Sequence, residues 1–155
     1  MLTPEAAADV VEIRQLQARY GDVVSRRAWS ELDALFAPDA TVTLDLRTRA
    51  PIELVGPRAV GAFIAGAVER FDHFQLALLD AVVDLTGDRT AVGRMYTWEL
   101  RHEPGAGWSH AYGVYDDRFE RRRDTWVFVE RRYRSVARTD GETTEVLGVP
   151  PLPWS

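Results

Sequence analysis

The chain has 155 residues, of which 46% are hydrophobic and 28% are charged, as expected for one compact domain. It contains no Cys, Lys or Asn, which excludes disulfides, thiolate metal sites, lysine Schiff bases and the lysine-containing phosphate loop. The formal net charge of −5 argues against a nucleic-acid partner, because phosphate binding needs a positive surface. No apolar run approaches the roughly 20 residues of a membrane span, and the acidic first segment does not resemble a signal peptide. We therefore expect a cytoplasmic protein with no membrane partner.

The first half of the chain predicts three helices and one early strand. Thr3 is a plausible N-cap, and Pro4 suits the first position of a helix that ends near Arg26. On this helix Ile13, Gln17, Tyr20 and Val24 form one stripe, which points Tyr20 inward. The later elements of this half are a short helix at 31–36, an alternating strand at 41–46 and a helix that opens at Gly56-Pro57.

The second half predicts a meander of four long strands. These strands cover residues 73–85, 90–102, 109–122 and 126–138. Residues 1–140 form the predicted domain, and residues 141–155 form an extended Pro-rich tail. The fold class is therefore α+β, with three N-terminal helices packed on a curved antiparallel sheet. Such a sheet forms a cone with an interior pocket, where a small ligand would bind.

Several short segments, spread over roughly residues 10 to 138, together carry a family resemblance. They are Arg19-Tyr20, Trp29 to Val42, Gly56 to Val60, His73-Phe74, Asp84 to Ala91 and Trp126 to Phe128. In this order they resemble SnoaL-like proteins of the nuclear transport factor 2-like superfamily. The resemblance implies the same cone fold. The superfamily includes dehydratases, isomerases, cyclases, epoxide hydrolases and non-catalytic binding domains.

Scytalone dehydratase and bile-acid dehydratases offer the nearest mechanistic resemblance, and ketosteroid isomerase a more distant one. The dehydratases are similar in placing a Tyr and an Asp on the first helix and a His after the third helix. The matching catalytic positions are Tyr20, Asp22 and His73. Asp22 lies about 200° around the helix from Tyr20, so it either contacts His73 from the flank or faces solvent. His73 lies between Phe71 and Phe74, so we expect its ring to enter the apolar interior.

The pocket wall is expected to come from several elements. Tyr96 and Trp98 are two residues apart and therefore lie on the same face of their strand. We expect them to form either this wall or a subunit interface. The predicted substrate-binding residues are Phe36, Leu44, Phe63, Tyr96, Trp98, His110 and Tyr112. The spacing of His and carboxylate residues matches no metal signature, so we expect neither a metal nor another cofactor.

The expected function is cofactor-independent proton transfer next to a carbonyl, giving dehydration or isomerisation. His73 would be the base and Tyr20 the hydroxyl donor, acting on a hydrophobic oxygenated molecule of polyketide or steroid type. The alternatives are a polyketide-type cyclase and a non-catalytic binding or assembly domain. We also expect a homodimer or homotrimer formed through the outer sheet face. The apolar tail is expected to cover the pocket entrance or a neighbouring subunit.

Overall fold

The computed structural model describes residues 1–154 and begins with the long helix α1, Pro4–Arg26. The helix starts where the sequence predicts, because the Thr3 hydroxyl accepts a hydrogen bond from the Ala6 amide at 3.1 Å. It ends at Arg27, which adopts a left-handed conformation with φ of 58°. The stripe that contains Ile13, Tyr20 and Val24 is buried. Within residues 1–154, no helix has the length and apolar character needed to cross a membrane.

The next elements are the 3-10 helix η1 (Trp29–Ala34), the strands β1 (Phe36–Asp45) and β2 (Ile52–Val55), and the helix α2 (Pro57–Val68). The predicted short second helix is a 3-10 helix that lies two residues earlier than predicted, and β1 begins five residues earlier than predicted. Phe36 pairs with Phe128, and the Phe128 amide donates to the Leu35 carbonyl at 3.0 Å. The chain thus joins the sheet before Pro38. The pairing is irregular around that residue, which has no amide hydrogen to donate.

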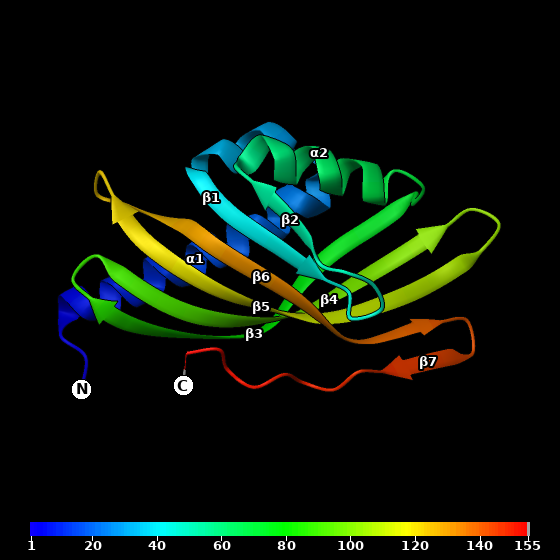
Figure 1. The fold of residues 1–155 in the computed structure, drawn as a ribbon. Helices are drawn as coiled ribbons and strands as arrows, with labels where there is room; N and C mark the ends of the chain where they lie inside the picture. The colour runs from blue at the N-terminus through cyan, green and yellow to red at the C-terminus, as the bar shows by residue number, and fades with distance from the viewer. Residues whose placement is uncertain (155) are drawn as a thin grey trace.

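Five further strands complete the sheet. They are β3 (His73–Gly87), β4 (Thr90–Glu103), β5 (Gly107–Arg122), β6 (Thr125–Asp140) and β7 (Thr143–Val146). The strand order is β2-β1-β6-β5-β4-β3, with β7 paired to β6. Figure 1 shows the sheet curving around the helices, which confirms the predicted α+β fold. The sheet is mixed rather than fully antiparallel, because β1 runs parallel to β6.

A buried ion pair lies on the concave face of the sheet. Arg131 donates two hydrogen bonds to Asp117, at 2.7 and 2.9 Å, and both side chains have no exposed surface. The Arg131 guanidinium also stacks on the rings of Tyr20, Tyr115 and Phe128, between 4.0 and 4.2 Å from each ring centre. This packing fixes the two tyrosines at the floor of the cone.

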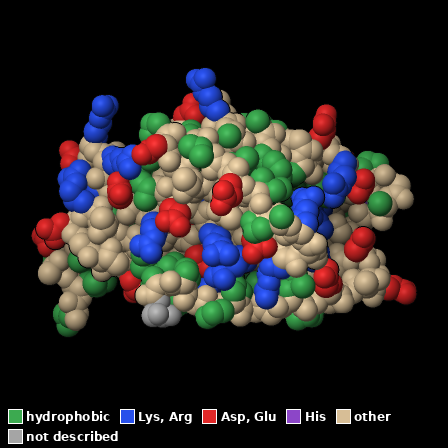
Figure 2. Space-filling model, in the orientation of Figure 1, with side chains coloured by type: hydrophobic (Ala, Val, Ile, Leu, Met, Phe, Trp, Pro, Cys, Tyr) green, Lys and Arg blue, Asp and Glu red, His purple; other side chains and the backbone are tan. Residues whose placement is uncertain are grey.

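The C-terminal segment lies along the convex face of its own sheet (Figure 1), so it does not cover the pocket entrance. The alternative, that it covers a neighbouring subunit, remains a prediction. The buried Arg94 guanidinium pairs with Asp116 and also donates to the carbonyls of Pro150 and Pro151 at 2.8 and 3.1 Å. Arg134 donates to the Pro151 carbonyl as well, at 3.2 Å. The tail therefore supplies acceptors that these arginines need on the convex side. In the space-filling view (Figure 2), basic and acidic side chains are interspersed across the visible face.

Candidate active site

A cavity of about 230 Å³ lies between α1, α2 and the concave face of the sheet. This is far more than the about 10–15 Å³ that a cavity needs to hold one water molecule. Its apolar lining consists of Val24, Leu44, Leu46, Ile52, Phe63, Ile64, Ala67, Val68, Phe71, Phe74 and Leu76. Its polar lining consists of Tyr20, Tyr115, Tyr133, Glu99, Arg49, Arg70 and Arg101. An apolar enclosure with a few convergent polar groups is the usual form of a small-molecule site.

Three phenols from three elements meet in this cavity. Tyr20 comes from α1, Tyr115 from β5 and Tyr133 from β6. The hydroxyls of Tyr20 and Tyr115 lie 3.4 Å apart, and the ring centres of Tyr115 and Tyr133 lie 5.0 Å apart. Burial raises the pKa of all three phenols. They therefore stay protonated near neutral pH and can donate hydrogen bonds to an oxygen of a ligand.

Gly113 makes room for one of these rings. A Cβ atom added at Gly113 would lie 2.2 Å from the Tyr133 ring, which is closer than two carbon atoms can approach. The register between β5 and β6 shifts at Tyr112 and Gly113. Glycine at this position lets the Tyr133 ring lie close to the β5 backbone and contribute to the cavity wall.

Glu99 and Arg101 of β4 add charged groups to the cavity. Their side chains are 20% and 19% exposed, and Arg101 Nη1 lies 3.7 Å from Glu99 Oε2. Burial raises the pKa of Glu99, and the charges of Arg101 and Arg138 oppose this shift only in part. The Glu99 charge in turn raises the pKa of Tyr20, Tyr115 and Tyr133. A carboxyl group whose pKa moves toward neutrality is suited to accept and return a proton.

The structure brings some of the predicted site residues to this cavity. Tyr20, Leu44 and Phe63 line it, and their parts in binding or catalysis remain predictions. Phe36 lies outside the lining: it is buried in the core, with its ring centre 6.0 Å from that of Tyr20.

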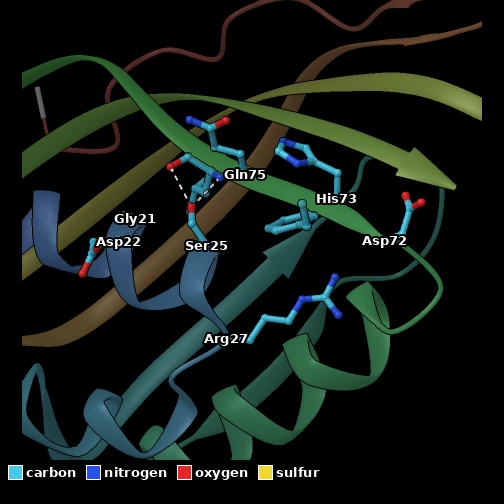
Figure 3. Close-up of a pocket in the computed structure, with 9 residues that line it drawn as sticks. Gly21, Asp22, Ser25, Arg27, Asp72, His73 and Gln75 are labelled. Atoms are coloured by element: carbon cyan, nitrogen blue, oxygen red, sulfur yellow. Dashed lines mark hydrogen bonds between the residues drawn. The ribbon is translucent and has the colours of Figure 1, made fainter.

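His73 and Asp22 lie outside the cavity, in an open groove between α1 and β3 (Figure 3). The expectation that the His73 ring enters the interior is wrong. Alternate residues of β3 face opposite sides, and since Phe74 and Leu76 face inward, His73 is exposed and packs against Trp108. Asp22 is 61% exposed and pairs with Arg26 at 2.8 Å. Figure 3 shows Asp22 and His73 at opposite ends of the groove. Of the two expected positions of Asp22, the structure therefore shows the one that faces solvent.

The face of β4 that lines the cavity is the opposite of the predicted one. Met95 and Thr97 are buried on the concave side, and Glu99 and Arg101 continue that face. The four remaining predicted substrate-binding residues lie on the convex side; they are Tyr96, Trp98, His110 and Tyr112. There Trp98 Nε1 donates to His110 Nδ1 at 2.9 Å, and the Trp98 and Tyr112 rings stack. Their prediction as pocket residues is therefore wrong, because strand residues alternate between faces and the register selects the other set.

Six polar residues of the cavity were not predicted from the sequence: Arg49, Arg70, Glu99, Arg101, Tyr115 and Tyr133. The available signal was the spacing of Glu99 and Arg101, which follow Thr97 at intervals of two residues. Within residues 1–154, no group of three or more His, Asp or Glu side chains is placed to hold a metal ion.

Solved structures share this architecture over nearly the whole chain. A candidate scytalone dehydratase from Novosphingobium aromaticivorans DSM 12444 matches with a TM-score of 0.80 and 18% identity, covering 97% of this chain and 99% of that one. The hexachlorocyclohexane dehydrochlorinase LinA-type3 from Novosphingobium barchaimii LL02 matches with a TM-score of 0.78 and 19% identity, covering 95% and 98%. An NTF2-like protein with a cystatin-like fold, also from N. aromaticivorans, matches with a TM-score of 0.69 and 22% identity, covering 83% of this chain and 82% of that one. At these identities the matches show the fold alone.

Comparison of sequences, rather than of structures, identifies the family of this chain. No curated protein matches the sequence significantly. The sequence profile of the SnoaL-like domain matches residues 5–132, which span both the helices and most of the sheet. The chain therefore belongs to the SnoaL-like domain family.

Proposed function

We propose that the cavity binds a small hydrophobic molecule with a carbonyl group and catalyses proton transfer next to that carbonyl without a cofactor. The reaction would be a dehydration or an isomerisation. One observation carries this proposal: three protonated phenols and a carboxyl group of raised pKa line the same largely apolar cavity. An unfilled cavity of this kind also supports ligand binding over a purely architectural role.

Each polar group has a defined part in this reaction. The Glu99 carboxylate removes a proton from the carbon next to the carbonyl, and the electron pair moves onto the carbonyl oxygen. The hydroxyls of Tyr20 and Tyr115, 3.4 Å apart, donate hydrogen bonds to that oxygen as its negative charge develops. The proton on Glu99 then passes to a departing hydroxyl group, which leaves as water, or to another carbon, which moves the double bond.

The named structural neighbours are consistent with this class of chemistry. A dehydratase removes water, and a dehydrochlorinase removes hydrogen chloride. Both are eliminations, and an elimination needs a group that takes a proton from carbon. In the present chain Glu99 is the cavity residue suited to that task, and the open groove with His73 is not part of the proposal.

Deuterium exchange tests the proposal without knowledge of the natural substrate. Small hydrophobic ketones and β-hydroxy ketones are incubated with the protein in D₂O, and NMR measures loss of the proton signal next to the carbonyl. Ala67 lines the cavity, so Ala67→Trp is expected to block it and abolish exchange. Ala62→Trp is the matched control, because Ala62 is an exposed residue of the same helix outside the lining. Exchange that survives Ala67→Trp, or ketones that bind without exchange, would contradict the proposal.

We also propose that the protein is a homodimer or homotrimer that associates through the convex sheet face. Tyr96, Trp98 and Tyr112 are only half-buried there. The tail lies on the same face, and its Val149 and Leu152 are 56% and 40% exposed. A second copy of the chain would cover this apolar surface.

A further inference from the structure

The side chains that line the cavity carry a net positive charge, whereas the whole chain carries a net negative charge. Three arginines, Arg49, Arg70 and Arg101, line the cavity together with a single carboxylate, Glu99. The whole chain carries a formal net charge of −5. A concave, partly apolar site lined with one sign of charge concentrates its electric field and attracts ligands of the opposite sign.

The hydrogen bonds and ion pairs that these arginines make within the protein leave N–H donors that can bind a ligand. Arg49, on the segment between β1 and β2, makes no hydrogen bond or ion pair within residues 1–154. Arg101 approaches Glu99 at 3.7 Å, which is too long for a hydrogen bond. The Nε atom of Arg101 donates to the Ser109 hydroxyl at 3.2 Å, which holds the guanidinium in place.

Two of the guanidinium groups gather at one aromatic ring. The Arg70 guanidinium lies 4.5 Å from the centre of the Phe71 ring, and the Arg101 guanidinium lies 5.3 Å from it. Arg70 also lies 3.5 Å from Glu103, but its side chain is 60% exposed, so this ion pair is weak. Two cations beside one ring repel each other, and an anion bound between them would offset this repulsion.

We propose that the ligand of this cavity is a small hydrophobic acid whose carboxylate is bound by Arg49, Arg70 and Arg101 at the cavity mouth. This inference rests on the proposed function, because it assigns the substrate class to the same site. The planar guanidinium fork matches a carboxylate with two parallel hydrogen bonds. Tyr20 and Tyr115 are 1% and 5% exposed, whereas Arg49 is exposed. A carboxylate held at the mouth would therefore direct the apolar body and its carbonyl inward to the phenols.

Calorimetry on matched ligands tests this assignment. The probes are phenylpyruvate and cinnamate, each compared with its uncharged methyl ester. The wild-type protein is expected to bind at least one acid about tenfold or more tightly than its ester, since charge-assisted hydrogen bonds are lost in the ester. In the double variant Arg49→Ala/Arg70→Ala most of this preference for the acid is expected to be lost, because only Arg101 remains to bind the carboxylate. Arg58→Ala is the control: it removes a positive charge from an exposed site on α2 outside the cavity and should keep the preference.

Several results would overturn the assignment. These are equal affinity of acid and ester in the wild-type protein, a preference for the acid that is undiminished in the double variant, or the absence of binding by either pair. Phenyl phosphate is included as a third anion. If it binds more tightly than both acids, the assigned ligand group is a phosphate and not a carboxylate.

Deuterium exchange on phenylpyruvate separates this inference from the proposed reaction. A retained preference for the acid without exchange would refute the reaction and leave the ligand class standing. Exchange that depends on Glu99, without any preference for the acid, would refute the ligand class alone.

Discussion

The buried guanidinium of Arg131 organises the floor of the cavity at the level of single residues. It pairs with Asp117 out of contact with water and stacks on Tyr20 and Tyr115. Its positive charge lowers the pKa of Tyr20, but the effect of burial is larger and the pKa remains raised. Breaking a buried ion pair by removing one partner costs about 3–5 kcal/mol. The two phenols are thus held by an interaction that tolerates little change.

Tyr20→Phe is expected to slow deuterium exchange by about 10²-fold, the loss typical of one hydrogen-bond donor to a developing oxyanion. The ring stays in the core while the donor to the carbonyl oxygen is removed. Exchange rates measured by NMR at saturating ketone check this. His73→Ala is the control and should retain the wild-type rate, because that ring lies on the outer side of β3. A wild-type rate in Tyr20→Phe would remove this phenol from the mechanism.

Glu99 is expected to reduce the stability of the folded protein at neutral pH. Since burial raises its pKa, the folded chain holds this proton more readily than the unfolded chain. The free energy of unfolding therefore falls as the pH rises through the unfolded and then the folded pKa. Glu99→Gln lacks this cost. It should be more stable than the wild type at pH 7, and this advantage should vanish below about pH 4, where the carboxyl is protonated in both states.

Urea denaturation at pH 7 and pH 4 measures this difference. Glu53→Gln serves as the control, because Glu53 is an exposed glutamate on β2 and its replacement should be neutral at both pH values. A Glu99→Gln variant that is less stable at pH 7, or whose advantage does not change with pH, would show that burial does not dominate at Glu99.

At the level of elements, β4 shows where sequence patterns succeed and where they fail. The strand itself was predicted within one residue of its bounds, because its period-two pattern is strong. The face of β4 that lines the cavity was not predicted correctly, because both faces carry large side chains. Tyr96 and Trp98 belong to the more hydrophobic face. The cavity instead takes Glu99 and Arg101, whose charges predict an outward direction. Hydrophobic patterning finds a packed core, and a polar cavity departs from it because its groups serve a ligand.

The tail supplies a prediction at the same scale. Deleting residues 147–155 removes the carbonyl acceptors of Arg94 and Arg134 and should lower the free energy of unfolding by about 1.5–3 kcal/mol. Ligand affinity and exchange should stay unchanged, because the tail lies on the face opposite the cavity. Denaturation and calorimetry on the truncated protein check both. Unchanged stability, or affinity lost by more than about tenfold, would contradict this arrangement.

For the whole molecule, the order of helices and strands was sufficient to predict the cone. The early helices and the meander of long strands have strong local signals, such as the Thr3 cap and the turn at 87–90. The parallel pairing of β1 with β6 was missed, because it joins residues about 90 positions apart and no local pattern encodes it. The contact between Tyr20 and Tyr115 was missed for the same reason, since they are 95 residues apart.

At the level of the whole molecule, the apolar side chains on the convex face predict self-association. Sedimentation velocity at tens of micromolar protein is expected to show a dimer or trimer. Trp98→Arg, which places a charge among these half-buried aromatic side chains, should shift the protein toward the monomer. A wild-type monomer at this concentration would contradict the proposed association.

The rate of deuterium exchange in Glu99→Gln tests the central claim most directly. On a ketone that the wild-type protein exchanges, the variant is expected to lose about 10²–10⁴-fold in rate while binding the ketone with similar affinity. The wild-type rate should rise with pH as Glu99 loses its proton, since only the carboxylate accepts one. Exchange at the wild-type rate in Glu99→Gln, with the ketone bound, would show that this cavity does not use Glu99 to move a proton.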